Sequence, residues 1–146
     1  MSHLIYILNG PNLNLLGTRE PEIYGKESLP DIEKSLENLS KKHNIEIKFI
    51  QSNAEHEIID SIQNAKSEGI KFILINPGPL THTSIALRDT FLSIQIPFIE
   101  IHISNIYARE DFRQMSYLSD IAQGVISGLG IEGYELALNT AFKKFN

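Results

Sequence analysis

The chain begins with the apolar run Leu4-Ile-Tyr-Ile-Leu8, followed at once by Asn9-Gly-Pro-Asn-Leu-Asn-Leu-Leu-Gly-Thr-Arg-Glu-Pro-Glu-Ile-Tyr-Gly25. The run has the length and composition of a buried strand, and the Asn-Gly-Pro after it cannot continue a sheet ladder. The residues up to Gly25 show neither a helical nor a strand period. Because loops of this length are usually functional or disordered, we interpret this stretch as a polar lid with flexible ends at Gly17 and Gly25.

Strand-like and helix-like segments alternate along the rest of the chain. Further strands are expected at residues 45–50, 71–75, 97–101 and 124–128, and helices at 28–43, 55–66, 83–93 and 131–145. The run at 71–75 is the most apolar, which favours the central position in the sheet, and Ser28 with Asp31 forms a capping-box start for its helix. The alternation predicts one α/β domain over residues 1–146, a flavodoxin-like doubly wound five-stranded parallel sheet with helices on both faces.

The composition excludes several classes of protein. With 146 residues and no cysteine, the chain can build a core of ordinary size, and disulfides, thiolate metal sites and cysteine nucleophiles are ruled out. A formal charge of −5 argues against a nucleic-acid partner. No apolar run reaches membrane-spanning length, and the apolar start is too short for a signal peptide. We therefore expect a cytoplasmic protein that uses neither a membrane nor nucleic acid.

The arginines are more informative than the net charge. Nine lysines mostly mark amphipathic stretches, whereas the four arginines, Arg19, Arg88, Arg109 and Arg113, lie in irregular or motif-like segments. The planar guanidinium suits carboxylates and phosphates. This distribution favours a site for a small anion, with structural ion pairs as the alternative.

In doubly wound folds the ligand site lies beyond the carboxyl ends of the strands. This rule brings together the loop after the first strand, the segment 76–82 after the third, and the end of the fourth at 100–104. Glu100 and His102 are two residues apart, so on an extended strand their side chains leave the same face. A carboxylate beside an imidazole selects its tautomer, which makes His102 a candidate general acid or base.

Two further side chains allow alternative interpretations. Tyr24 is a weak base at its ordinary pKa, but Arg19 in the same loop would stabilise its phenolate; otherwise Tyr24 is a surface or packing residue. His82 is either a ligand contact ahead of a helix or a polar residue near its cap. The histidines show no metal-ligand spacing, so no metal site is expected.

Three known uses of this fold do not fit the sequence. The loop after the first strand lacks the hydroxyl- and glycine-rich character of a flavodoxin phosphate loop. A phospho-receiver domain needs an aspartate after the third strand, where this chain has Asn76-Pro77. The Gly-x-Gly-x-x-Gly pattern of dinucleotide binding is also missing. The fold is therefore shared with these classes but their sites are not.

Taken together, the motifs resemble those of type II 3-dehydroquinate dehydratase, along essentially the whole chain. The motifs are Asn9-Gly-Pro-Asn-Leu-Asn-Leu-Leu-Gly-x-Arg-x-Pro-x-x-Tyr-Gly25, Asn76-Pro-Gly-x-x-Thr-His-Thr-Ser84 with Ala86-Leu-Arg-Asp89, and Glu100-x-His-Ile-Ser-Asn105 with Ala108-Arg-Glu110, Phe112-Arg113 and Ser116-Tyr117. The resemblance implies a cofactor-free hydro-lyase of the shikimate pathway, which eliminates water from 3-dehydroquinate through an enolate to give 3-dehydroshikimate. A flavodoxin-like binding or regulatory module without turnover is the alternative.

The resemblance also implies roles for particular residues. Tyr24 would be the base that removes a proton beside the substrate ketone, and Arg19 would keep it anionic. Asn12 would hold the water or oxygen that stabilises the enolate. His102, oriented by Glu100, would protonate the departing hydroxyl.

Substrate contacts implied by the resemblance come from Asn76, His82, Arg113 and the backbone of Ile103 and Ser104, and Asp89 would reach a neighbouring subunit's site. The family usually assembles as a dodecamer of four trimers. The chain departs from the family pattern at Pro79, Leu80 and Tyr107. Lys26 is the one lysine among the motifs, so no imine mechanism is expected.

Overall fold

The computed structural model describes residues 4–18 and 20–145, and within them it has a five-stranded parallel sheet of order β2-β1-β3-β4-β5. The strands are β1 (Ile5–Asn9), β2 (Ile47–Gln51), β3 (Phe72–Asn76), β4 (Phe98–His102) and β5 (Gly124–Ser127). This order is that of the doubly wound flavodoxin-like fold, which confirms the predicted class. The expected central strand, β3, does lie in the middle.

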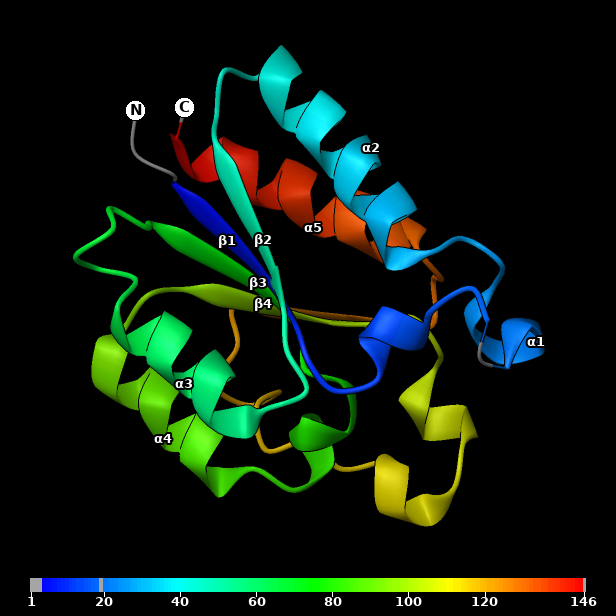
Figure 1. The fold of residues 1–146 in the computed structure, drawn as a ribbon. Helices are drawn as coiled ribbons and strands as arrows, with labels where there is room; N and C mark the ends of the chain where they lie inside the picture. The colour runs from blue at the N-terminus through cyan, green and yellow to red at the C-terminus, as the bar shows by residue number, and fades with distance from the viewer. Residues whose placement is uncertain (1–3, 19, 146) are drawn as a thin grey trace.

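Helices cover both faces of this sheet (Figure 1). One face carries α2 (Leu29–Lys42) and α5 (Glu132–Phe142), and the other carries α3 (Glu55–Gln63) and α4 (Ile85–Ile94). The start of α2 is the predicted capping box, in which Ser28 Oγ accepts from the Asp31 N–H at 3.3 Å and Asp31 Oδ2 accepts from the Ser28 N–H at 3.0 Å.

The core has two halves, one under each helical layer, and β1 contributes to both. Ile5 and Ile7 pack with α2 and α5, whereas Tyr6 and Leu8 pack with α3 and α4. This division follows from the alternation of side chains along a strand, and it explains why a buried parallel strand has no polar face.

The strands extend further than the apolar runs indicated. The first, third and fourth strands were expected to end at Leu8, Ile75 and Ile101, but each continues to the polar residue that follows. Asn9 pairs in register with Asn76 of β3, and His102 pairs with Ser127 of β5. Ladder hydrogen bonds use the backbone, so a polar side chain does not end a strand. The carboxyl edge of the sheet is consequently a row of polar residues.

The segments that follow β1 and β3 contain helical turns that the sequence did not indicate. The stretch expected to be an irregular lid contains a 3-10 turn at Leu13–Leu15 and the single-turn helix α1 (Pro21–Tyr24). A 3-10 turn, Gly78–His82, precedes α4, which is capped by Ser84. His82 and the expected interface residue Asp89 therefore do not share a helix.

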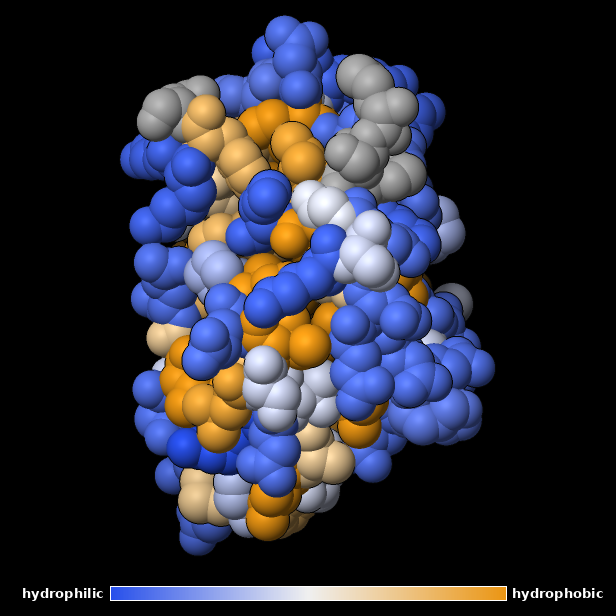
Figure 2. Space-filling view, turned by 90° about the vertical axis from the view of Figure 1, so that its left-hand side faces the viewer, coloured by the Kyte–Doolittle hydropathy of each residue, from blue (hydrophilic) through white to orange (hydrophobic). Residues whose placement is uncertain are grey.

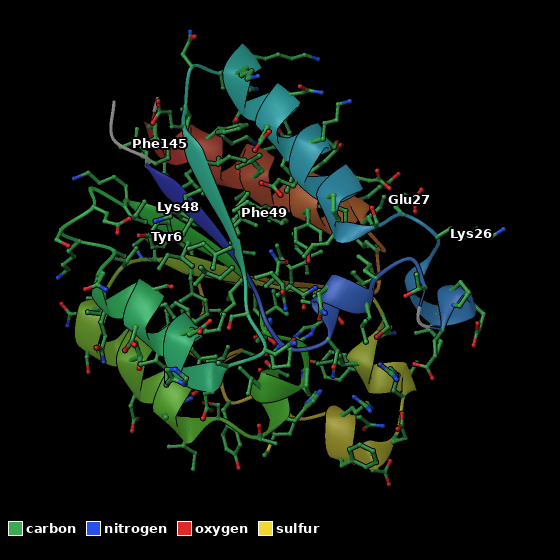
Figure 3. The ribbon with its side chains drawn as sticks, in the orientation of Figure 1. Tyr6, Lys26, Glu27, Lys48, Phe49 and Phe145 are labelled. Carbon is green, nitrogen blue, oxygen red and sulfur yellow. The ribbon has the colours of Figure 1, made fainter. Side chains whose placement is uncertain are left out.

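The amino end of the sheet is closed by side chains. Tyr6 donates a hydrogen bond to Glu68, and Lys48 lies 3.3 Å from the same carboxylate and 5.7 Å from the Tyr6 ring centre (Figure 3). Figure 2 views the molecule from this end, where hydrophilic residues predominate and apolar ones show between them. No helix within the described residues is long and apolar enough to cross a bilayer.

Candidate active site

A pocket opens at the carboxyl edge of the sheet, where the fold rule placed the site. It is walled by the segment after β1, the 3-10 turn after β3, and the end of β4 with the segment that follows. Its lining residues are Pro11, Asn12, Leu13, Leu16, Asn76, Gly78, Pro79, His82, His102, Ile103, Ser104, Ile106, Arg109 and Arg113.

Most of the candidate residues that the structure describes meet at this pocket, and Asp89 does not. Asn12, Asn76, His82, His102, Ile103, Ser104 and Arg113 line it, and Glu100 lies directly behind His102. Asp89 is exposed on α4 and is not part of the lining. Arg19 lies outside the described residues, as does the side chain of Tyr24, whose backbone ends α1.

Glu100 and His102 form the buried pair that their spacing predicted. Their side chains are almost completely shielded from solvent, and His102 Nε2 hydrogen-bonds to Glu100 Oε2. Burial alone would raise the pKa of the Glu100 carboxyl, but hydrogen bonds from His102 and from nearby serines hold that pKa below its ordinary value. The pair is therefore a carboxylate facing an imidazole N–H, so Nδ1 is the ring nitrogen of His102 that Glu100 does not hold.

Two hydroxyl groups also bind Glu100. Thr81, in the turn after β3, donates to Oε2 at 3.0 Å, and Ser119, ahead of β5, donates to Oε1 at 2.7 Å. Neither residue was predicted to act at the site. Thr81 lies within the motif that begins at Asn76, and Ser119 lies outside all three motifs. Their proximity arises from chain segments that sequence spacing does not relate.

His82 occupies the wall next to His102, with the two ring centres 6.4 Å apart. Its Nδ1–H donates to the Met115 carbonyl at 2.8 Å, because a carbonyl can only accept. Burial lowers the pKa of His82, which favours the neutral imidazole. His82 therefore offers Nε2 to a ligand as an uncharged hydrogen-bond partner.

A second buried network holds Asn76 from the other face of the sheet. Its Nδ2 donates to the Tyr134 hydroxyl at 2.9 Å, and Tyr134 donates to Asn9 Oδ1 at 2.7 Å. Asn76 Oδ1 accepts from the Gly78 N–H at 3.2 Å, so the amide is held at both ends. Tyr134 and Asn9 were missed as functional residues; the available signal was a phenol within the apolar face of the last helix.

The loops after β1 and β3 touch through glycine. Gly10 donates its N–H to the Asn76 carbonyl at 2.8 Å, and a Cβ on Gly10 would lie 2.2 Å from the Pro77 carbonyl oxygen. Asn12 has a left-handed backbone with φ of 72°, and its N–H donates to Asn53 Oδ1 at 3.0 Å. Glycine thus permits the close approach that places Asn12 beside Asn76.

The four arginines divide into different environments. Arg109 and Arg113 line the pocket, and Glu110 lies 3.7 Å from the first and 3.2 Å from the second. Arg88 instead pairs with Asp120 on the outside of α4, so for this residue the structural alternative is correct. The expected anion site is therefore reduced, among the described residues, to the two arginines that follow β4.

The lid segment from Gly17 to Gly25 contributes to a second cavity, which shares Ile103 with the pocket. Gly17 and Gly25 have φ of 94° and 85°, values that favour glycine and that bracket α1. Ile23 and Gly25 share a small cavity with Ile103, the residue that follows His102. Lys26 is exposed and extends away from the protein (Figure 3).

The fold and pocket define a doubly wound α/β enzyme of the acid–base type, with a buried carboxylate–imidazole pair at its carboxyl edge. Within residues 4–18 and 20–145, no cluster of His, Asp or Glu is arranged to hold a metal.

The sequence profile of the family described as dehydroquinase class II matches residues 3–142. The chain therefore belongs to the class II dehydroquinase family.

Named relatives support this assignment at high identity. The chain is 62% identical over 136 residues to the 3-dehydroquinate dehydratase of Buchnera aphidicola subsp. Acyrthosiphon pisum, covering 93% of this chain and 90% of that protein. It is 58% identical to the 3-dehydroquinate dehydratase of Idiomarina loihiensis, covering 97% and 93%. The crystal structure of a type II dehydroquinase from Butyrivibrio crossotus superposes with a TM-score of 0.92 at 44% identity, covering 94% and 97%.

Proposed function

We propose that this chain is a hydro-lyase that converts 3-dehydroquinate to 3-dehydroshikimate by trans elimination of water through an enolate, without a cofactor. Family membership supports the reaction. The observation that carries the mechanism is the buried Glu100–His102 pair, which opens on one side to the pocket. The elimination requires an acid, a base and stabilisation of the enolate oxygen, and side chains can supply all three.

His102 is the acid in this mechanism. Its Nε2–H is engaged by the Glu100 carboxylate, so the proton that leaves the imidazolium is the one on Nδ1. Glu100 is the positioning group, because its negative charge and fixed place orient the ring. The leaving hydroxyl takes the proton and departs as water.

Tyr24 is the base, kept as a phenolate by Arg19, and Asn12 holds the water that hydrogen-bonds to the enolate oxygen. These roles come from the family motif. They are supported by the position of α1, whose residue Ile23 lines a cavity together with Ile103, the residue after the proposed acid. Removal of a proton next to a ketone by a phenolate needs a cation close to the ring, as the resemblance assigns to Arg19.

The rest of the pocket binds the substrate. Asn76 and His82 face its hydroxyls, and Arg113 with the backbone of Ile103 and Ser104 holds its carboxylate. Arg113 already hydrogen-bonds to Glu110 at 3.2 Å, so the substrate carboxylate replaces a carboxylate of the protein. Arginine suits this exchange because its planar fork serves two acceptors.

The enzyme acts as a homo-oligomer, a dodecamer of four trimers, in which Asp89 reaches the active site of a neighbouring subunit. The exposed position of Asp89 on α4, away from its own pocket, supports this role. A cytoplasmic location suits an enzyme that acts on a small soluble acid.

A direct ultraviolet assay for the enone formed from 3-dehydroquinate tests the proposal. Turnover by the wild type that disappears in His102→Gln supports both the proposed elimination and the role of His102 as its acid. A folded wild-type protein that binds 3-dehydroquinate but forms no enone would instead support the binding-module alternative.

A further inference from the structure

The Glu100 carboxylate is enclosed by donors from three separate chain segments. Ser119 Oγ donates to Oε1 at 2.7 Å, Thr81 Oγ1 donates to Oε2 at 3.0 Å, and His102 donates from β4 itself. Glu100 and Thr81 are both 0% exposed. Each oxygen of the carboxylate is therefore held from a direction set by a different segment.

The hydroxyls donate in a fixed sense, because an ionised carboxylate can only accept. The proton of Thr81 is directed to Glu100, and Ser116 Oγ lies 2.7 Å from Thr81 Oγ1. Ser116 Oγ accepts from the Leu118 N–H at 3.1 Å, and its own hydroxyl helps to lower the pKa of Glu100. Ser116 is thus a further hydroxyl beside the carboxylate.

We propose that Thr81 and Ser119 are positioning residues for the reaction, which fix the plane of the Glu100 carboxylate and thereby hold His102 with Nε2–H toward Glu100 and Nδ1 toward the substrate. A carboxylate held by His102 alone could rotate about its Cγ–Cδ bond and allow the imidazole to turn. Two further donors, one on each oxygen, prevent this rotation. The inference rests on the proposed role of His102 as the acid.

The other titratable groups near the pair are not altered by these substitutions. His82 faces His102 across 6.4 Å between ring centres, and Arg109 and Arg113 face the pocket from the segment after β4. These groups act on the electrostatics of His102 in every variant considered, so a difference between variants reports on the hydroxyls.

The kinetic test compares Ser119→Ala and Thr81→Val with Ser119→Thr and Thr81→Ser, which keep the hydroxyl. The removals should lower kcat about tenfold with KM within about threefold, and the conservative variants should recover most of the loss. Ser61→Ala, which removes a hydroxyl bonded to a helix carbonyl in α3, is the matched control and should retain wild-type kinetics. Thr81 is wholly buried, so if Thr81→Val fails to fold, the partly exposed Ser119 decides the matter.

A second readout does not depend on turnover. Nitrogen-15 NMR of the histidine side chains should show His102 of the wild type as the Nε2–H tautomer. Ser119→Ala should give a mixture of tautomers. If the wild type shows this tautomer but forms no enone, the proposed function fails while the positioning stands. If Ser119→Ala keeps both the wild-type kcat and the single tautomer of His102, the positioning role is overturned.

Discussion

The two regions assigned to acid and base are built differently. The acid side, Glu100 and His102, is buried on a central part of the sheet and held by hydrogen bonds from several segments. The side assigned to the base is a single helical turn, α1, whose residues Glu22 and Ile23 are exposed and whose described backbone hydrogen bonds are local. The proposed acid is therefore preorganised by the fold, whereas the proposed base stands on the single helical turn α1.

This difference predicts that the two regions contribute to catalysis in different ways. Preorganised groups lower the barrier without a cost of reorganisation during the reaction, while a lid admits the substrate and then excludes water. Changes on the lid side should therefore affect turnover without affecting stability, and changes on the acid side should affect both.

The largest effect is expected from Tyr24→Phe, which removes the phenol and keeps the ring. We expect kcat to fall by about 10³ or more with the free energy of unfolding unchanged, because the lost interaction exists in the transition state alone. Tyr107→Phe is the control, since Tyr107 is exposed and lies outside the pocket lining. A folded Tyr24→Phe enzyme with more than about a tenth of wild-type kcat would remove Tyr24 from this role.

Arg19→Ala should similarly lower turnover and raise the basic pKa in the pH profile of the enzyme.

Glu100→Gln should lower kcat about a hundredfold, because the amide cannot stabilise the imidazolium. It should also change stability with pH. The pKa of Glu100 is below its ordinary 4.5, so its ionisation stabilises the native state above that pH and this contribution is lost as the pH falls through the folded value. Acid unfolding should thus be steeper in the wild type than in the variant. Asp60→Asn on α3 is the exposed control, and equal acid sensitivity in Glu100→Gln would contradict the assignment.

Gly10→Ala should destabilise the protein by about 2 kcal/mol or more, because the new Cβ would overlap the Pro77 carbonyl. Gly124→Ala is matched to it, as a Cβ there meets nothing within 4 Å. Chemical denaturation of both variants measures the difference. Equal stability would mean that the loops after β1 and β3 move apart at little cost.

Asp89→Ala should lower kcat about tenfold and weaken association, if Asp89 completes the site of a neighbour. Asp60→Ala tests whether loss of any exposed carboxylate does the same. Sedimentation at the assay concentration measures the assembly. Full turnover by a monomer of 16.5 kDa would refute the interface role.

The smallest effect is expected at Lys26, the lysine nearest the motifs. Lys26 extends away from the protein, so borohydride added during turnover should neither inactivate the enzyme nor add substrate mass to it (Figure 3). Lys26→Ala should keep kcat within about twofold of wild type. Mass spectrometry that finds a reduced adduct on Lys26 would overturn the enolate mechanism.

Chelators added to the assay should leave the rate of enone formation unchanged.

The fold class and the central position of β3 were accessible from the sequence because periodicity and turn residues are local. The pair Glu100 and His102 was accessible for the same reason, since side chains two apart share one face of a strand. The ends of the first, third and fourth strands were placed one residue early, because polarity was taken as a stop although Asn9, Asn76 and His102 keep their ladder bonds. The sequence could not distinguish arginines of the pocket from arginines in structural ion pairs, because the partner of Arg88 is Asp120, far along the chain.

The sequence by itself determined the order of elements, the edge at which the site lies and, through its motifs, the family. The tertiary structure decided what holds each polar group. Tyr134 meets Asn9 across 125 positions, and Ser119 meets Glu100 across nineteen. A buried polar group must be paired, but its partner is whichever donor the packing of the layers brings within reach. That choice depends on three-dimensional proximity, which no local pattern of residues contains.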